Sequence, residues 1–220
     1  MENKRILFSE ELDRVRHDIV AMSSLVEEGL GKAMAAFQNN DMELAKTVRE
    51  GDAAVNAMQL QIEDAVVTLI ATQQPVARDL REIFTMLKIA VNLERAGDHA
   101  VHLAKTAMKL SGRASFRAVE HMELMAKTGQ EMIRASISAY RKQDPEAARK
   151  AAALDDIIDG EHRKLSGEML GLMKKHPGLL KKALRFLQTS GDLERLGDHV
   201  TNICEAIIYM TESRHEELNE

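Results

Sequence analysis

A motif that occurs twice, 100 residues apart, constrains the fold of this 220-residue chain more than any other sequence feature. Residues 92–100 read Asn-Leu-Glu-Arg-Ala-Gly-Asp-His-Ala, and residues 192–200 read Asp-Leu-Glu-Arg-Leu-Gly-Asp-His-Val. Further upstream, residues 41–52 correspond to residues 144–155. Because the two offsets differ by only three residues, we interpret the halves as copies of one structural unit.

Apolar residues recur at steps of three and four through most of the chain, which is the pattern of amphipathic helices. Asp41 and Asp144 are predicted N-caps, and Pro75 and Pro177 disfavour helical geometry in the residue before them. The breaks in the pattern predict six helices, at about residues 9–37, 41–72, 75–110, 115–140, 144–175 and 177–211.

The composition supports an all-α fold and argues against several other classes. Aromatic residues make up 3% of the chain and only three prolines are present, so strands lack their favoured residues and helices have few breaks. The single cysteine, Cys204, excludes an intrachain disulfide and Cys-rich zinc modules. The net charge of −5 argues against nucleic acid as a partner. Because neither a membrane-spanning run nor a signal peptide is visible, we expect a cytoplasmic protein.

The predicted architecture is all-α, a tandem duplication of two three-helix bundles that pack side by side. We place the first three-helix repeat at residues 1–112 and the second at residues 113–220, since residues 111–113 are the weakest helical segment. The apolar stripe of the two motif-bearing helices, which would face the core, comprises Leu93, Ala96, Ala100, Leu103, Ala107, Leu193, Leu196, Val200, Ile203 and Ile207.

The repeated motif places two carboxylates on one face of its helix. Glu94 and Asp98 are one helical turn apart, and so are Glu194 and Asp198. We expect both pairs to lie roughly opposite the apolar stripe. Two like charges at this spacing oppose helix formation by roughly 0.2–0.5 kcal/mol, and the glycine between them costs up to ~1 kcal/mol relative to alanine. An unfavourable local choice that occurs twice indicates a use beyond the fold, such as the close approach of a ligand or a neighbouring helix.

The preceding helix of the second repeat supplies further oxygen ligands. Asp155 and Asp159 are again one turn apart, and antiparallel packing would bring them toward Glu194 and Asp198. Such hard ligands suit magnesium, manganese, calcium or iron, and His162 on the same helix face would extend the choice to zinc.

The first repeat contains a weaker version of this metal site, formed by Asp52, Asn56, Glu94 and Asp98. Asn56 keeps an oxygen ligand but lacks the negative charge, so a cation should bind there less tightly. The alternative interpretation is that these acidic residues are solvated, or paired with lysine and arginine one turn away. We expect the motif histidines, His99 and His199, to pack through hydrogen bonds rather than to bind metal.

A ferritin-like di-iron oxidase is a further alternative, because it is also helical and rich in carboxylates. That class needs Glu-x-x-His on two helices, whereas Glu212 and His215 lie in an expected frayed tail, and Asp159 with His162 matches only in part. The sequence contains no glycine-rich phosphate loop, Ser-His-Asp arrangement or nucleophile motif. We therefore predict that the chain is not an enzyme.

The two Leu-Glu-Arg-x-Gly-Asp-His segments are similar to the paired motif of the PhoU family, accessory regulators of the bacterial phosphate-specific transport system. Residues 50–56, 74–81 and 202–205 also resemble that family, so the likeness extends essentially from end to end. The tandem three-helix bundles that the resemblance implies agree with the architecture predicted above.

The resemblance implies a cytoplasmic, non-enzymatic regulator of phosphate uptake and phosphate-starvation signalling. Such a protein connects the phosphate ABC transporter, through its ATP-binding subunit, to a sensor histidine kinase at the inner face of the membrane. It acts as a negative regulator while phosphate is plentiful. We expect a homodimer with peripheral membrane association and without nucleic acid. An accessory protein of a different phosphate carrier is the alternative.

The resemblance further implies that the motif carboxylates bind magnesium, manganese, zinc or iron ions. Carried onto this sequence, the metal-binding residues are Glu94, Asp98, Asp155, Asp159, Glu194 and Asp198, with Asp52 and Asn56 in the weaker set. The amide of Asn56 departs from the acidic pattern of the family.

Overall fold

The computed structural model describes residues 2–109 and 116–219, which form helices joined by short connections, without a strand. The first half contains α1 (Glu2–Asn39), α2 (Met42–Gln73) and α3 (Arg78–Ala107). The second half contains α4 (Phe116–Lys142), α5 (Pro145–Ala152), α6 (Asp155–Lys175), the 3-10 helix η1 (Pro177–Leu179) and α7 (Leu180–Glu212). The predicted repeat boundary after residue 112 lies outside the described residues. None of the described helices is long and apolar enough to cross a membrane.

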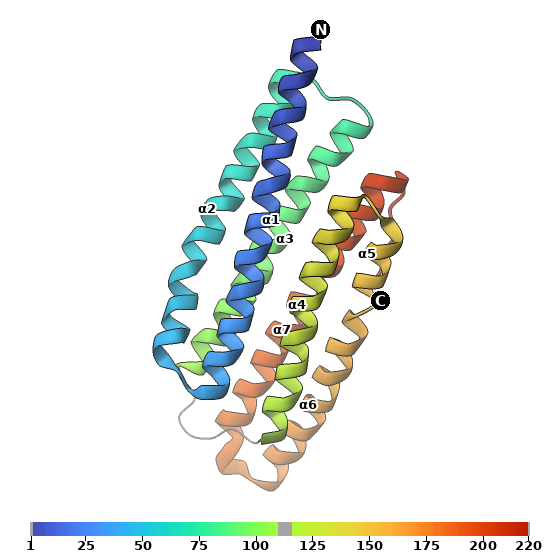
Figure 1. Ribbon diagram of the computed structural model, residues 1–220. Helices are drawn as coiled ribbons and strands as arrows, with labels where there is room; N and C mark the ends of the chain where they lie inside the picture. Colours follow the sequence, from blue (N-terminus) through green and yellow to red (C-terminus); the bar gives the residue numbers. More distant parts are fainter. Residues whose placement is uncertain (1, 110–115, 220) are drawn as a thin grey trace.

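Two helical bundles lie side by side along their length (Figure 1). The helices α1, α2 and α3 form one bundle, and α4 to α7 form the other. The most extensive contact between any two helices joins α3 to α7, the two that carry the repeated motif. Since α1 also packs against α4, the bundles adhere through two pairs of helices. The predicted all-α bundle fold is confirmed.

The helix ends follow the polar signals of the sequence. Asp41 and Asp144 are N-caps as predicted, because the side chain of each accepts a backbone hydrogen bond of 3.0 Å. The donors are the N–H groups of Leu44 and Ala147, each three residues after its capping aspartate. At the other end of α2, Gln74 adopts a left-handed conformation with a φ of 50°, which stops the helix.

The fifth predicted helix, over residues 144–175, is interrupted and forms α5 and α6. At the interruption, the N–H of Leu154 bonds to the carbonyl of Ala151, three residues back instead of four. Ala153 and Leu154 keep right-handed helical angles, so α6 continues along the same bundle as α5 (Figure 1). Together α5 and α6 take the place of one long helix, and the six-helix plan is preserved.

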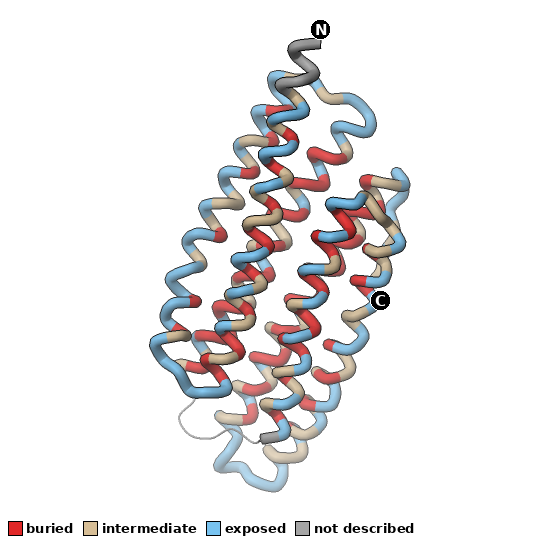
Figure 2. Tube along the Cα trace, viewed as in Figure 1, coloured by how far each residue is buried: buried red, intermediate tan, exposed pale blue. Residues whose placement is uncertain are grey.

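The buried residues form an interior that runs through both bundles, and they recur along every long helix (Figure 2). All ten residues of the predicted apolar stripe are buried, with at most 4% of their surface exposed. Burial of a large aliphatic side chain contributes about 1.5–3 kcal/mol, so the stripes of α3 and α7 stabilise the fold substantially. These two helices therefore hold the repeated motif in a fixed position at the centre of the molecule.

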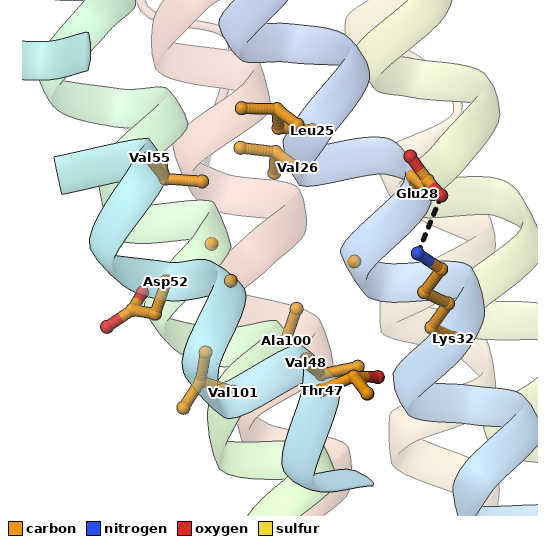
Figure 3. A pocket seen from close by; sticks show the side chains of 13 residues that line it. Leu25, Val26, Glu28, Lys32, Thr47, Val48, Asp52, Val55, Ala100 and Val101 are labelled. Carbon is orange, nitrogen blue, oxygen red and sulfur yellow. Dashed lines mark ion pairs between the residues drawn. The ribbon is translucent and has the colours of Figure 1, made fainter. Parts of the chain in front are cut away.

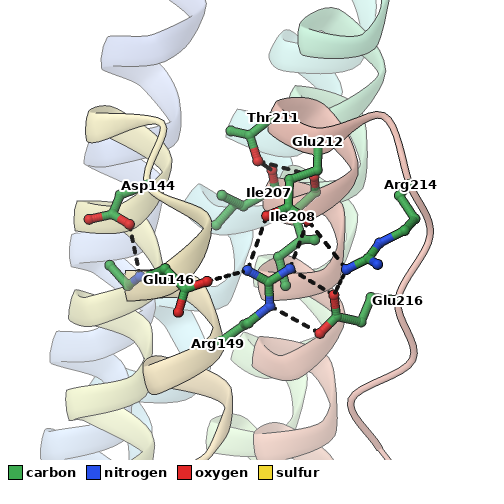
Figure 4. Close-up of polar contacts among 10 residues, drawn as sticks. Asp144, Glu146, Arg149, Ile207, Ile208, Thr211, Glu212, Arg214 and Glu216 are labelled. Atoms are coloured by element: carbon green, nitrogen blue, oxygen red, sulfur yellow. Dashed lines mark hydrogen bonds and ion pairs between the residues drawn. The ribbon is translucent and has the colours of Figure 1, made fainter.

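The segment that follows α7 folds back and is held by ion pairs (Figure 4). A guanidinium nitrogen of Arg149, on α5, lies 2.8 Å from Glu212 Oε2 and 2.7 Å from Glu216 Oε2. Farther along, the amide of Asn219 donates a hydrogen bond of 3.2 Å to Oδ1 of Asp198, one of the predicted metal ligands. The tail is thus anchored rather than frayed, and it reaches the repeated motif.

Candidate functional site: carboxylates and histidines of the repeated motif

The two copies of the motif occupy equivalent environments on α3 and α7. Residues 91–100 and residues 191–200 show the same order of buried, half-buried and exposed positions. Glu94 and Asp98 lie on either side of the buried Gly97, with 16% and 37% of their side-chain surfaces exposed. A position opposite the apolar stripe, as predicted, would leave the carboxylate pairs fully exposed. They are instead only partly exposed, although hydrocarbon does not enclose them.

In the second repeat, Asp155 of α6 lies directly against Gly197 of α7. A β-carbon at position 197 would be 2.1 Å from Oδ1 of Asp155, so this approach requires glycine. Oδ2 of Asp155 accepts a hydrogen bond of 3.2 Å from Thr201. Oδ1 is buried and has no hydrogen-bond partner among the described residues. Burial of an acceptor oxygen without a partner lowers the free energy of unfolding by about 1–3 kcal/mol, and a bound cation would relieve this penalty.

The four predicted carboxylates of the second repeat influence one another electrostatically. Burial, followed by the negative charges of Asp159 and Asp198, raises the pKa of Asp155 to about 7. Burial, together with Glu194 and Asp159, also raises the pKa of Asp198. The helices α6 and α7 thus bring these side chains into one cluster with an excess of negative charge.

The histidines that could have joined such a cluster are engaged elsewhere. Nδ1 of His162 lies 3.0 Å from Oγ of Ser190, within hydrogen-bonding distance. His215 stacks on Tyr209, with ring centroids 4.2 Å apart. These contacts leave the carboxylate cluster with oxygen donors, and they give no support to the di-iron oxidase alternative.

The motif of the first repeat has different surroundings (Figure 3). A cavity of about 100 Å³ lies beside Gly97, between α1, α2 and α3, and its lining includes Val26, Val55, Ala100 and Asp52. A β-carbon at position 97 would meet Val55 at 3.5 Å, which is ordinary van der Waals contact. The glycine of this copy therefore faces an apolar side chain where the other copy faces a carboxylate.

The predicted polar residues of the first repeat still form a smaller cluster. Burial and the charge of Asp98 raise the pKa of both Asp52 and Glu94. Oδ1 of Asn56 is buried and lacks a hydrogen-bond partner within the described part of the chain. Arg95 lies 3.6 Å from Oε2 of Glu94 and 3.8 Å from Oδ2 of Asp98. Ion pairing with arginine, the alternative considered above, therefore occurs in this copy.

The motif histidines link the two repeats reciprocally. Nδ1 of His99 lies 3.1 Å from Oδ1 of Asp192, and Nδ1 of His199 lies 3.0 Å from Oδ1 of Asn92. The two imidazole rings stack, with centroids 5.6 Å apart and an interplanar angle of 25°. Burial, followed by the charges of His99 and Arg95, lowers the pKa of His199. The hydrogen bonds predicted for both histidines are therefore present.

Sequence reasoning missed two residues next to this histidine pair, His102 and Asp192. Nδ1 of His102 lies 3.3 Å from the same oxygen of Asp192 that contacts His99. Burial alone would raise the pKa of Asp192, but hydrogen bonds with both histidines lower this pKa below its ordinary value. Within residues 2–109 and 116–219, these three side chains are the group of His, Cys, Asp or Glu residues whose ligand atoms all lie within 4.8 Å of one another. The predicted carboxylates do not form such a group.

The fold and site define a two-repeat, all-helical protein in which an acidic, histidine-containing motif lies at the centre of each repeat. The family model described as "PhoU domain" matches this chain at residues 19–107 and again at residues 122–207. The chain therefore belongs to the PhoU family.

Relatives of known name match the chain over nearly its full length. A phosphate-specific transport system accessory protein PhoU homolog from Clostridium acetobutylicum is 34% identical over 98% of this chain and 99% of its own length. The phosphate-specific transport system accessory protein PhoU of Escherichia coli is 31% identical over 92% of this chain and 84% of its own length. The crystal structure of PhoU from Pseudomonas aeruginosa, at 32% identity, covers 94% of this chain and 100% of that chain with a TM-score of 0.90.

Proposed function

We propose that this chain is an accessory protein of a bacterial phosphate-specific transport system and that it restrains phosphate uptake. The observation that carries the proposal is the 34% identity, over 98% of this chain, to a protein named for that system. Because the similarity spans both repeats rather than one motif, it concerns the whole scaffold and not a single ligand-binding element.

In this proposal the chain is a non-enzymatic adaptor on the cytoplasmic side of the membrane. It contacts the ATP-binding subunit of the phosphate ABC transporter and a sensor histidine kinase. It acts as a homodimer in peripheral contact with the membrane, and it keeps the phosphate-starvation response off while phosphate is plentiful. The outer faces of the helices are exposed along most of their length, which leaves surface for contacts with partners (Figure 2).

Capture of partners from cells grown at high and low phosphate tests this function. The tagged chain should retain the ATP-binding subunit and the sensor kinase at high phosphate, and deletion of its gene should raise phosphate-starvation transcripts under the same condition. Recovery of a different phosphate carrier would favour the alternative accessory role. Unchanged transcripts and unchanged phosphate uptake after deletion would contradict the proposal.

The carboxylate cluster of the second repeat binds a divalent cation or iron in this proposal. Its oxygen donors fit magnesium, manganese or iron, and the buried Oδ1 of Asp155 supplies an oxygen without another partner. Zinc fits less well because His162 is bonded to Ser190. The first-repeat cluster binds more weakly, since Asn56 brings no charge and Arg95 partly neutralises the motif pair. Without a cation, both clusters should repel an anionic lipid leaflet.

Metal analysis of purified protein tests the carboxylate site. Glu194→Ala and Asp198→Ala should each lose most of the manganese that the wild-type protein retains after dialysis, because each removes a charged ligand. Glu120→Ala, which changes an exposed carboxylate on α4, is the matched control and should retain the metal. Equal metal content in all four proteins would leave these carboxylates with a structural or partner-binding role only.

A further inference from the structure

We infer that His99, His102 and Asp192 form a separate metal site, which binds Zn²⁺ or a similar transition-metal ion between the two repeats. The two histidines lie three residues apart on α3, and the aspartate lies on α7. One ligand atom from each residue lies within 4.8 Å of both others. Two imidazoles and one carboxylate suit zinc, cobalt, nickel or ferrous iron, whereas magnesium and calcium prefer oxygen ligands alone.

The two distances from the histidines to the aspartate match the edges of a metal coordination polyhedron. Nδ1 of His99 lies 3.1 Å and Nδ1 of His102 lies 3.3 Å from Oδ1 of Asp192. Zinc bonds of about 2.0–2.2 Å place neighbouring ligand atoms of a tetrahedron roughly 3.3 Å apart. Small side-chain rotations therefore suffice to admit the ion, provided that the Nδ1 atom of each ligating imidazole carries no proton.

The three ligands are exposed to different degrees. His99 and Asp192 have 12% and 17% of their side-chain surfaces exposed, and stacking on His199 further fixes the ring of His99. His102 is 49% exposed and borders a surface groove of about 550 Å³. The protein thus supplies two well-fixed ligands and one on the rim, and the fourth coordination position opens toward the groove.

Cationic side chains share this groove with the ligands. Lys105, Lys109 and Arg195 contribute to its lining. Their charges oppose the approach of a bare cation, but they favour an anion as the fourth ligand once the metal is bound. The positive charge of this groove distinguishes the histidine site from the carboxylate cluster, where negative charge is in excess.

The other copy of the motif provides an internal comparison. His199 and Asn202 lie 100 residues after His99 and His102, and Asn92 lies 100 residues before Asp192. Asn92 and Asn202 border a smaller groove of about 260 Å³. Because neutral amides are poor ligands for zinc, this copy lacks two of the three ligands. The metal site therefore belongs to one side of the molecule only.

Cobalt titration of the full chain tests the site. Glu194→Ala with Asp198→Ala serves as the background, so that binding to the carboxylate cluster does not obscure the result. On this background Co²⁺ should bind with the visible absorption of imidazole-ligated cobalt, and His102→Ala should weaken that binding about tenfold or more. Asn202→Ala, the matched change in the other copy, should leave the affinity unaltered. Circular dichroism verifies that each variant is folded.

A gain of binding provides the second arm of the test. The paired substitutions Asn92→Asp and Asn202→His reproduce the ligands in the other groove and should add a second imidazole-dependent equivalent of cobalt. Equal cobalt affinity in the background protein and its His102→Ala variant would overturn the inference, as would an equal loss in Asn202→Ala. A paired variant that gains no equivalent would overturn the assignment of these two positions as the source of the difference.

Discussion

Gly97 and Gly197 occupy the same position of the repeated motif but contact different side chains. A β-carbon would meet Val55 at 3.5 Å in the first copy and Asp155 at 2.1 Å in the second. We expect Gly97→Ala to raise the free energy of unfolding by up to ~1 kcal/mol, because alanine is the better helix former. Gly197→Ala must displace the carboxylate and should lower this free energy by about 1–2 kcal/mol. Urea unfolding measures both values, and equal stability of the two variants would contradict the close contact.

Asp155 should make the metal-free protein less stable as pH rises. Its pKa is about 7 in the folded chain against an ordinary value of 3.8, so the unfolded chain ionises first. The folded state therefore loses relative stability between about pH 4 and pH 7, and the penalty is complete above that range. Asp155→Asn removes it and should stabilise the protein by about 1–2 kcal/mol at pH 8, after allowance for partial solvent screening, and by little at pH 4.

Thermal unfolding in the presence of a chelator checks this pH dependence. The chelator keeps the carboxylate cluster free of cations, so that only the proton equilibrium of Asp155 is compared. Asp156→Asn is the matched control, because Asp156 is an exposed neighbour on the same helix. A melting temperature of Asp155→Asn that exceeds the wild-type value equally at pH 4 and pH 8 would show that titration is not the cause.

The residues of the candidate site were predictable to different extents. The spacing within one helix identified Glu194 and Asp198 as neighbours, and helix packing identified Asp155 as their partner. The roles of His102 and Asp192 were not predicted, because these residues lie on two different helices, α3 and α7, and come together only in the folded chain. Periodicity describes one helix at a time, so contacts between helices from different repeats are beyond it.

At the scale of helices, the ends were predictable wherever a side chain determines them. Asp41 and Asp144 can be identified from sequence, because their carboxylates cap the helices that follow. The interruption between α5 and α6 was not predictable, since it falls at Ala153 and Leu154, two good helix formers. There the break consists of a shorter backbone hydrogen bond, for which the sequence carries no signal.

One arginine of α5 makes the ion pairs that hold the first part of the segment after α7. Arg149 holds Glu212 and Glu216, and we expect Arg149→Met to release residues 213–217 (Figure 4). Because ion pairs between partly exposed side chains contribute little to global stability, the melting temperature should barely change. Amide hydrogen exchange should accelerate in the tail alone, and Arg141→Met on α4 serves as the control. Unchanged tail exchange in Arg149→Met would show that the ion pairs do not hold it.

At the scale of the whole molecule, the α3–α7 contact makes the two bundles one folding unit. Leu193 is 1% exposed, so Leu193→Ala should lower the free energy of unfolding by about 2–5 kcal/mol. Hydrogen exchange should show the same loss of protection in α1–α3 as in α4–α7. Leu60→Ala, at a side chain that is 61% exposed, should change stability by less than about 0.5 kcal/mol. Undiminished protection of α1–α3 in Leu193→Ala would mean that the bundles unfold independently.

The reciprocal histidine contacts bear on the origin of the chain. His99 meets Asp192 while His199 meets Asn92, so one helix surface is used twice, each copy against the other. This is the geometry of a twofold association between identical subunits. An ancestor of half the length would have made the same contact as a symmetric pair, before gene fusion joined the partners. In a pair of identical subunits, positions 92 and 192 would always carry the same residue. After fusion the two positions could differ, and they now carry the amide of Asn92 and the carboxylate of Asp192.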